Sequence, residues 1–185
     1  MGRSLGMIEF RTVSTGIHAT DRVLKTANLT LIQGQVVCPG KYIALFEGEL
    51  SAIVAGVEVA KSVYSENLIG TFVLGNPHES IFPAMYGTTQ VNKIKALGVF
   101  ETYDASTCIV AVDVAVKTAQ VELIEVRIAK GMCGKSYFTI TGDISSVDAA
   151  IESAKATALD KGMYLDSTVI ANADNQLTAT ILGNL

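Results

Sequence analysis

Apolar and polar positions alternate along the chain in a pattern that predicts strands and helices in a fixed order. In the first half, four segments have the composition or alternation of strands: residues 5–13, 29–37, 42–46 and 69–74. Two segments carry apolar side chains at helical spacing: residues 16–27 and 49–64. The resulting order is β-α-β-β-α-β. This order predicts an α+β fold, with an antiparallel sheet and both helices on one face of it.

The second half of the chain repeats the first. Leu5-Gly6-Met7-Ile8-Glu9 recurs as Leu97-Gly98-Val99-Phe100-Glu101, and 13 of the 28 residues from 5 to 32 are identical to the residue 92 positions later. Beyond residue 40 the offset grows to 94, because Gly40-Lys41 corresponds to Gly134-Lys135. We therefore predict two tandem domains of one fold, residues 1–93 and 94–185. The second domain has two extra residues in one turn, and insertions of this kind collect in loops.

That turn connects the second and third predicted strands of each domain. In the first domain it reads Val37-Cys38-Pro39-Gly40-Lys41, and in the second Lys130-Gly131-Met132-Cys133-Gly134-Lys135. Proline fixes φ and glycine permits positive φ, so both sequences are typical of tight turns. Cys38 is predicted to lie at the tip of a hairpin, accessible to solvent. The third cysteine, Cys108, lies at the start of a predicted helix and is interpreted as a small buried apolar residue.

Composition and charge exclude several classes of function. The net charge is -4 and no basic cluster occurs, which argues against nucleic acid as a partner. No uncharged apolar run is long enough for a membrane span, and the N-terminus lacks the apolar core of a secretory signal. Three cysteines do not make an even disulfide framework, so a reducing cytoplasmic setting is expected. No catalytic motif is present, and we expect no enzymatic activity.

A free thiol exposed at a turn is a liability for the protein unless it has a function. One thiol per chain cannot hold a metal cluster, but three chains around a threefold axis would supply three thiols at equal distances. Cys38 is therefore either a metal ligand shared between chains or a free surface thiol, and the residues alone leave both readings open.

Several motifs that occur in both halves carry a resemblance to a known family. They are the Leu5–Glu9 segment, Asp21 followed by Lys25-Thr26-Ala27, the small-residue turn before Lys41, and Gly48-Glu49 at the start of the second helix. Together they resemble bacterial microcompartment (BMC) shell domains. Two such domains in one chain resemble the tandem-domain trimer class, and the Cys38 turn resembles its PduT-type members.

The resemblance implies a role for each of these residues. Three chains would form a pseudohexameric disc with a central pore lined by two sets of turn residues: Pro39, Gly40 and Lys41, and Met132, Cys133 and Gly134. Cys38 of each chain would bind one [4Fe–4S] cluster on the axis, for electron transfer across the shell. Lys25 and Lys117 match the lysine at the edge of family tiles. The implied partners are other BMC shell proteins and a redox enzyme inside the compartment, and the implied location is the microcompartment shell.

Alternatives remain open at the level of sequence. The same tile without metal would have a central pore for small polar metabolites. A ferredoxin-like ligand-binding or regulatory protein is a third reading. Cys133 is a fourth cluster ligand, an alternative site or a free thiol.

Overall fold

The computed structural model describes residues 4–183, and within it the chain forms two compact units. The first unit comprises the chain up to Pro77 together with residues 130–133. The second comprises His78–Ala129 and the chain from Gly134 onward. The predicted domain boundary between residues 93 and 94 stays a prediction, and the segment 78–93 packs with the second unit.

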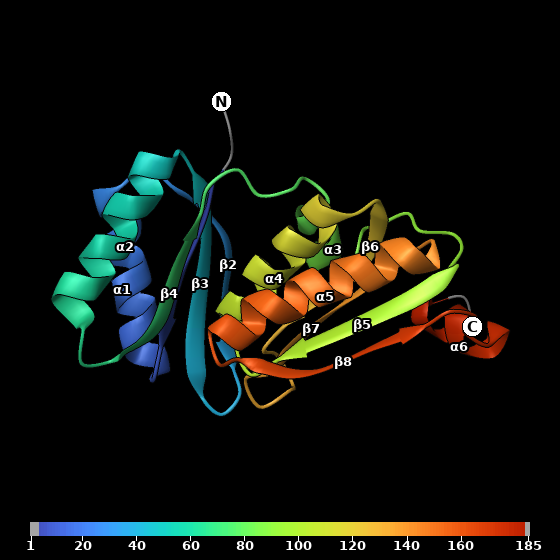
Figure 1. The fold of residues 1–185 in the computed structure, drawn as a ribbon. Helices are drawn as coiled ribbons and strands as arrows, with labels where there is room; N and C mark the ends of the chain where they lie inside the picture. Colours follow the sequence, from blue (N-terminus) through green and yellow to red (C-terminus); the bar gives the residue numbers. More distant parts are fainter. Residues whose placement is uncertain (1–3, 184–185) are drawn as a thin grey trace. The chain divides into compact units, whose positions relative to one another are not determined.

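The first unit is a four-stranded antiparallel sheet with two helices on one face (Figure 1). Its elements follow the predicted order: β1 (Ser4–Phe10), α1 (Val13–Thr26), β2 (Thr30–Val37), β3 (Lys41–Gly48), α2 (Leu50–Tyr64) and β4 (Leu68–Leu74). The strand order across the sheet is β2-β3-β1-β4. Alternate residues of β1, such as Ile8 and Phe10, face the helices and join a core with Val23 of α1 and Ile53 of α2.

The second unit repeats this architecture and adds two short helices. Its elements are α3 (Ile81–Tyr86), β5 (Ala96–Thr102), α4 (Ala105–Thr118), β6 (Val121–Ile128), β7 (Ser136–Gly142), α5 (Ile144–Asp160), β8 (Tyr164–Ile170) and α6 (Asn175–Ile181). The strand order is β6-β7-β5-β8, which corresponds strand for strand to the first sheet. The α+β fold predicted from sequence is therefore confirmed in both halves.

The irregularities of the two sheets also coincide. The β2–β3 register shifts between Leu31 and Gln33, and the β6–β7 register shifts between Leu123 and Glu125. A bulge adds one residue to one strand and turns the side chains beyond it. Because the bulges occupy equivalent positions, the duplication that the sequence shows extends to the details of strand pairing.

The predicted boundaries differ from the structure mainly at the first helix. The strand expected over residues 5–13 ends at Phe10, and α1 begins at Val13 rather than at residue 16. The apolar Val13 continues the strand-like pattern, but Thr12 is the extended N-cap residue of the helix, with φ -128° and ψ 147°. The short helices α3 and α6 were not predicted, because six and seven residues give too little periodicity.

The helix–sheet packing of the two units uses different residues at one equivalent place. At Gly16 on α1, an added Cβ would lie 2.5 Å from the Cβ of Tyr42 on β3. The corresponding residues of the second unit are Cys108 on α4 and Ser136 on β7. In the first unit, the large Tyr42 on the strand is combined with a glycine on the helix. In the second unit, the small Ser136 on the strand is combined with Cys108 on the helix. This exchange keeps each interior close-packed.

Candidate functional site

The first candidate turn joins β2 to β3. The N–H of Gly40 donates a hydrogen bond to the carbonyl oxygen of Val37 at 2.9 Å, and the Cys38–Pro39 peptide bond is cis. Gly40 has φ +98°, a conformation that strongly favours glycine. Val37 is buried and holds the turn to the sheet, whereas Cys38 is half-buried and Pro39 is exposed. The thiol of Cys38 is therefore free and partly accessible at the hairpin tip, as predicted.

The positive charge of Lys41 is paired with a buried carboxylate and not directed at the turn. Its Nζ lies 2.5 Å from Oε1 of Glu9, whose side chain is only 6% exposed. A buried carboxylate is costly unless a cation pairs with it. The ammonium of Lys41 on β3 therefore pairs with Glu9 on the neighbouring central strand β1, and its charge is not available to the turn.

The second candidate turn joins β6 to β7 and has a different conformation. Four of its residues have positive φ: Ala129 (55°), Gly131 (75°), Cys133 (54°) and Gly134 (89°). The N–H of Ala129 closes the turn by donating to the carbonyl oxygen of Lys135 at 3.1 Å. Cys133 is exposed, Met132 is half-buried and Gly134 is buried. The two turns are thus neither equal in length nor equal in backbone path.

The three cysteines occupy three different environments. Cys108 is fully buried, and burial raises the pKa of its thiol far above the usual range. It behaves as the small apolar core residue that the sequence predicted. Cys38 and Cys133 are the accessible thiols. Among residues 4–183, no group of three or more Cys, His, Asp and Glu side chains is placed to hold a metal ion. A cluster on Cys38 therefore requires thiols from more than one chain.

The two lysines assigned to the tile edge lie at equivalent places but in different surroundings. Lys25 pairs with Asp21 at 2.7 Å, and both side chains are well exposed, at 75% and 54%. Lys117 pairs with Asp113 at 2.6 Å, but Asp113 is only 6% exposed and also accepts a hydrogen bond from the N–H of His78. Lys25 is therefore held loosely at the surface, whereas Lys117 is tied to a buried carboxylate.

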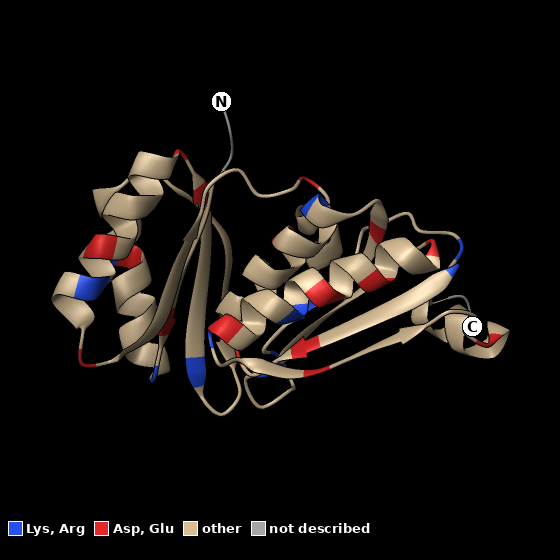
Figure 2. Cartoon of the chain, in the orientation of Figure 1, with Lys and Arg blue, Asp and Glu red and all other residues tan. Residues whose placement is uncertain are grey.

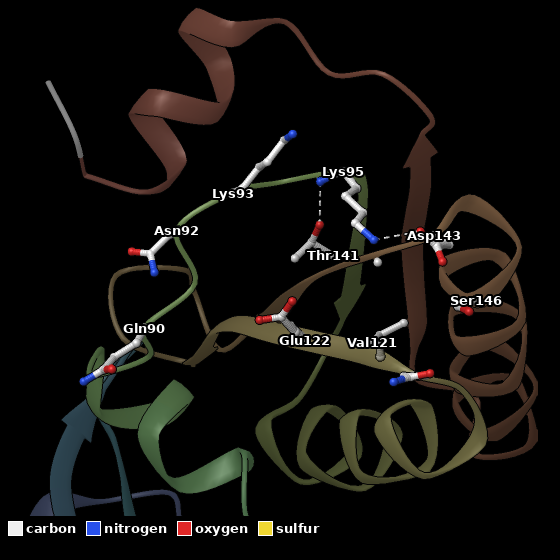
Figure 3. A pocket seen from close by; sticks show the side chains of 11 residues that line it. Gln90, Asn92, Lys93, Lys95, Val121, Glu122, Thr141, Asp143 and Ser146 are labelled. Carbon is white, nitrogen blue, oxygen red and sulfur yellow. Dashed lines mark hydrogen bonds and ion pairs between the residues drawn. The ribbon is translucent and has the colours of Figure 1, made fainter.

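A polar groove of about 590 Å³ lies in the second unit, away from either turn in the sequence (Figure 3). Its wall is held by Lys95, whose N–H donates to Oγ1 of Thr141 at 2.9 Å and whose Nζ lies 3.0 Å from Oδ1 of Asp143. Gln90, Asn92 and Glu122 add amide and carboxylate groups. The groove contains neither cysteine nor histidine, so it is unsuited to an iron–sulfur cluster. Sequence reasoning missed it because its residues come from three separate segments.

Charged residues elsewhere are dispersed. Lysine and arginine are interspersed with aspartate and glutamate in both units (Figure 2). Within residues 4–183, no helix combines the length and the apolar character needed to cross a membrane.

Comparison with known proteins identifies the family. The BMC domain model matches residues 4–77 and again residues 96–173, which together make up most of the chain. The chain therefore belongs to the BMC-domain family, the shell proteins of bacterial microcompartments, and carries two such domains in tandem. This confirms the family that the repeated motifs indicated.

A full-length relative narrows the class. The chain is 35% identical over 170 residues to the bacterial microcompartment shell protein PduT of Citrobacter freundii, covering 92% of each chain. It is thus a structural shell protein of the PduT type. A single-domain relative, carboxysome shell protein CcmK2 of Thermosynechococcus vestitus (strain NIES-2133 / IAM M-273 / BP-1), is 29% identical over 82 residues, 42% of this chain and 80% of that one.

Solved structures agree with this assignment. The crystal structure of a microcompartment protein from Desulfitobacterium hafniense DCB superimposes with a TM-score of 0.90 at 37% identity, covering 96% of this chain and 99% of that one. The fused permuted hexameric shell protein MSM0275 from the RMM microcompartment shares the fold, with a TM-score of 0.66 at 21% identity over 85% and 84% of the chains. The relatives are structural proteins, so the shell-protein reading replaces the ligand-binding or regulatory one.

Proposed function

We propose that three chains form a pseudohexameric shell tile in which Cys38 of each chain binds one [4Fe–4S] cluster on the threefold axis, for electron transfer across the shell. The observation that carries the proposal is the free, partly accessible thiol at the tip of the β2–β3 hairpin. The β6–β7 turn is longer and follows another backbone path, so a ring of such chains has threefold rather than sixfold chemistry at its centre.

The residues of the first turn fit a cluster shared between chains. The three Cys38 thiolates would bind three of the four irons of a cubane cluster. The fourth iron would take a ligand other than Cys38. An added Cβ at Gly40 would meet no atom within 4 Å, so the turn leaves space beside the thiol. Pro39 has no N–H, and that of Gly40 is used by Val37, so the turn adds little hydrogen bonding to sulfur. Such a cluster is labile and is best handled without oxygen.

The tile would work together with other shell proteins and with a redox enzyme inside the compartment. A cluster that spans the pore closes it to metabolites while giving electrons a route. The metal-free version of the same tile, with an open metabolite pore, makes the opposite prediction about iron content. The two functions are therefore separable by one chemical measurement.

The test is anaerobic reconstitution of the full chain with iron and sulfide. We expect a brown protein with about four irons and four sulfides per trimer, measured by metal and sulfide assay and by visible absorption. Cys38→Ser should abolish the chromophore, whereas Cys133→Ser, the matched accessible thiol, should retain it. A colourless, iron-free wild-type protein after reconstitution would support the metal-free pore, and light scattering of a monomer would contradict the tile.

A further inference from the structure

The short helix α3 covers one face of the second unit. We call this the α4·β6 face and define it by Asp113, Val116, Leu123 and Val126. Ile81 and Ala84 of α3 are 0% and 1% exposed and lie in one core cluster with the apolar residues of the face. The face is buried accordingly, with Leu123 and Val126 both 3% exposed.

A polar contact fixes the same segment to the same face. The N–H of His78, just before α3, donates to Oδ1 of Asp113 at 2.8 Å. Farther along, the hydroxyl of Thr89 donates to the carbonyl oxygen of Ile124 at 2.7 Å. The segment that follows β4 therefore has a complete docking site, with an apolar centre and hydrogen bonds at its ends.

The equivalent face of the first unit is bare. We call it the α1·β2 face and define it by the corresponding residues Asp21, Leu24, Leu31 and Gly34. Leu31 is 38% exposed where Leu123 is 3% exposed, and Gly34 is exposed where Val126 is buried. The side chain of Asp21 is 54% exposed. An exposed apolar strand face beside a helix in a duplicated fold indicates that a covering element is missing.

The chain carries a second element of the required kind. Leu177 of α6 follows the end of β8 at the same distance, seven residues, as Ile81 follows the end of β4. Yet α6 buries none of its residues, and Leu177 is 43% exposed. Figure 1 shows α6 beyond the end of β8, apart from helices α4 and α5. Only its end, at Ile181 and Leu182, packs against a small apolar cluster around Leu97 and Ile124.

We propose that α6 of one chain docks on the α1·β2 face of a second copy of this chain, with Leu177 taking the place that Ile81 takes within the chain. This inference rests on the trimeric tile proposed above and names the contact that holds it together. The charges agree, since Asp174 corresponds to His78 and is brought close to Lys25, which is 75% exposed. The N–H of residue 174 would then donate to Asp21, as that of His78 does to Asp113.

The contact is head-to-tail, as the ring-shaped tile proposed above requires. A heterologous contact either closes into a ring or continues as a filament. Here each copy offers one α6 and one α1·β2 face, so a closed ring leaves no face and no helix uncovered, and the tile proposed above is such a ring of three copies. The contact between chains then repeats the contact that α3 makes with the α4·β6 face within each chain.

The test measures the mass of the full chain by light scattering over a dilution series. Leu177→Asp and Leu31→Asp should each weaken association by about 30-fold or more, because each places a carboxylate in the centre of the contact. Val63→Asp is the control, since Val63 is 45% exposed and lies on α2, outside the α1·β2 face. Truncation after Ala173 removes α6 altogether and should have the same effect, with circular dichroism confirming that each variant is folded.

A mixing experiment tests the direction of the contact. Leu31→Asp retains an intact α6 and Leu177→Asp an intact α1·β2 face, so an equimolar mixture should form dimers from chains that are monomeric alone. A wild-type trimer with folded variants that remain trimers at the same dilution would overturn the docking and leave the tile intact. A wild-type monomer would instead overturn the tile and the docking together.

Discussion

At the scale of single residues, the three cysteines separate by surroundings. Cys133 is exposed, Cys38 is half-buried and Cys108 is fully buried. The sequence could indicate these differences because turns and apolar helix faces are recognisable patterns. It could not indicate that Lys41 forms an ion pair with Glu9, because that pair depends on how β3 lies against β1.

We predict the order in which these thiols react. In the metal-free folded chain, Cys133 and Cys38 should be alkylated at neutral pH, and Cys108 only after unfolding. Burial raises the pKa of the Cys108 thiol, so it offers almost no thiolate at neutral pH. Peptide mass mapping after timed alkylation measures the order. Labelling of Cys108 in the native protein at the rate of Cys133 would show that α4 is not packed as described.

At the scale of elements, the two halves solve the same packing problem with different residues. Gly16 lets Tyr42 lie against α1, whereas Cys108 and Ser136 occupy the equivalent places in the second unit. Hydrophobic periodicity predicted the main helices and strands well, because each has a long repeating pattern. It missed α3 and α6, which are too short to show a repeating pattern.

We predict that the packing residues are not exchangeable one at a time. Gly16→Cys should destabilise the protein by about 2 kcal/mol, because the new Cβ would overlap Tyr42 and force the helix outward. Adding Tyr42→Ser, which reproduces the combination of the second unit, should recover part of this loss. Chemical denaturation of both variants measures the change. Equal stability of the single variant and the wild type would contradict the close approach of α1 and β3.

At the scale of the whole molecule, duplication has produced two units whose equivalent lysines have different surroundings. Lys25 and Asp21 form an exposed pair, and surface pairs of this kind contribute little to stability. Lys117 neutralises the buried Asp113 beneath the segment that leads to α3. The lysine of the family pattern therefore forms only an exposed ion pair in the first unit. In the second unit it also stabilises a buried carboxylate.

We predict that the two lysines separate assembly from stability. Lys25→Ala should reduce the edge-to-edge growth of tiles seen by electron microscopy, with a change in unfolding free energy within about 0.5 kcal/mol. Lys117→Ala should lower stability by about 1–2 kcal/mol, because the buried side chain of Asp113 loses its cation. Thermal unfolding provides the comparison. Identical melting temperatures for the two variants would contradict the structural role of Lys117.

The sequence by itself determined the duplicated α+β fold, the shell family, and the turns that carry Cys38 and Cys133. These features are written in local patterns and in the repeat, which survive without knowledge of distant contacts. Only the tertiary structure decided which faces are covered, since Leu31 and Leu123 are the same residue in the same pattern. Burial depends on the segment that packs over a residue, and α3 covers only one of the two equivalent faces.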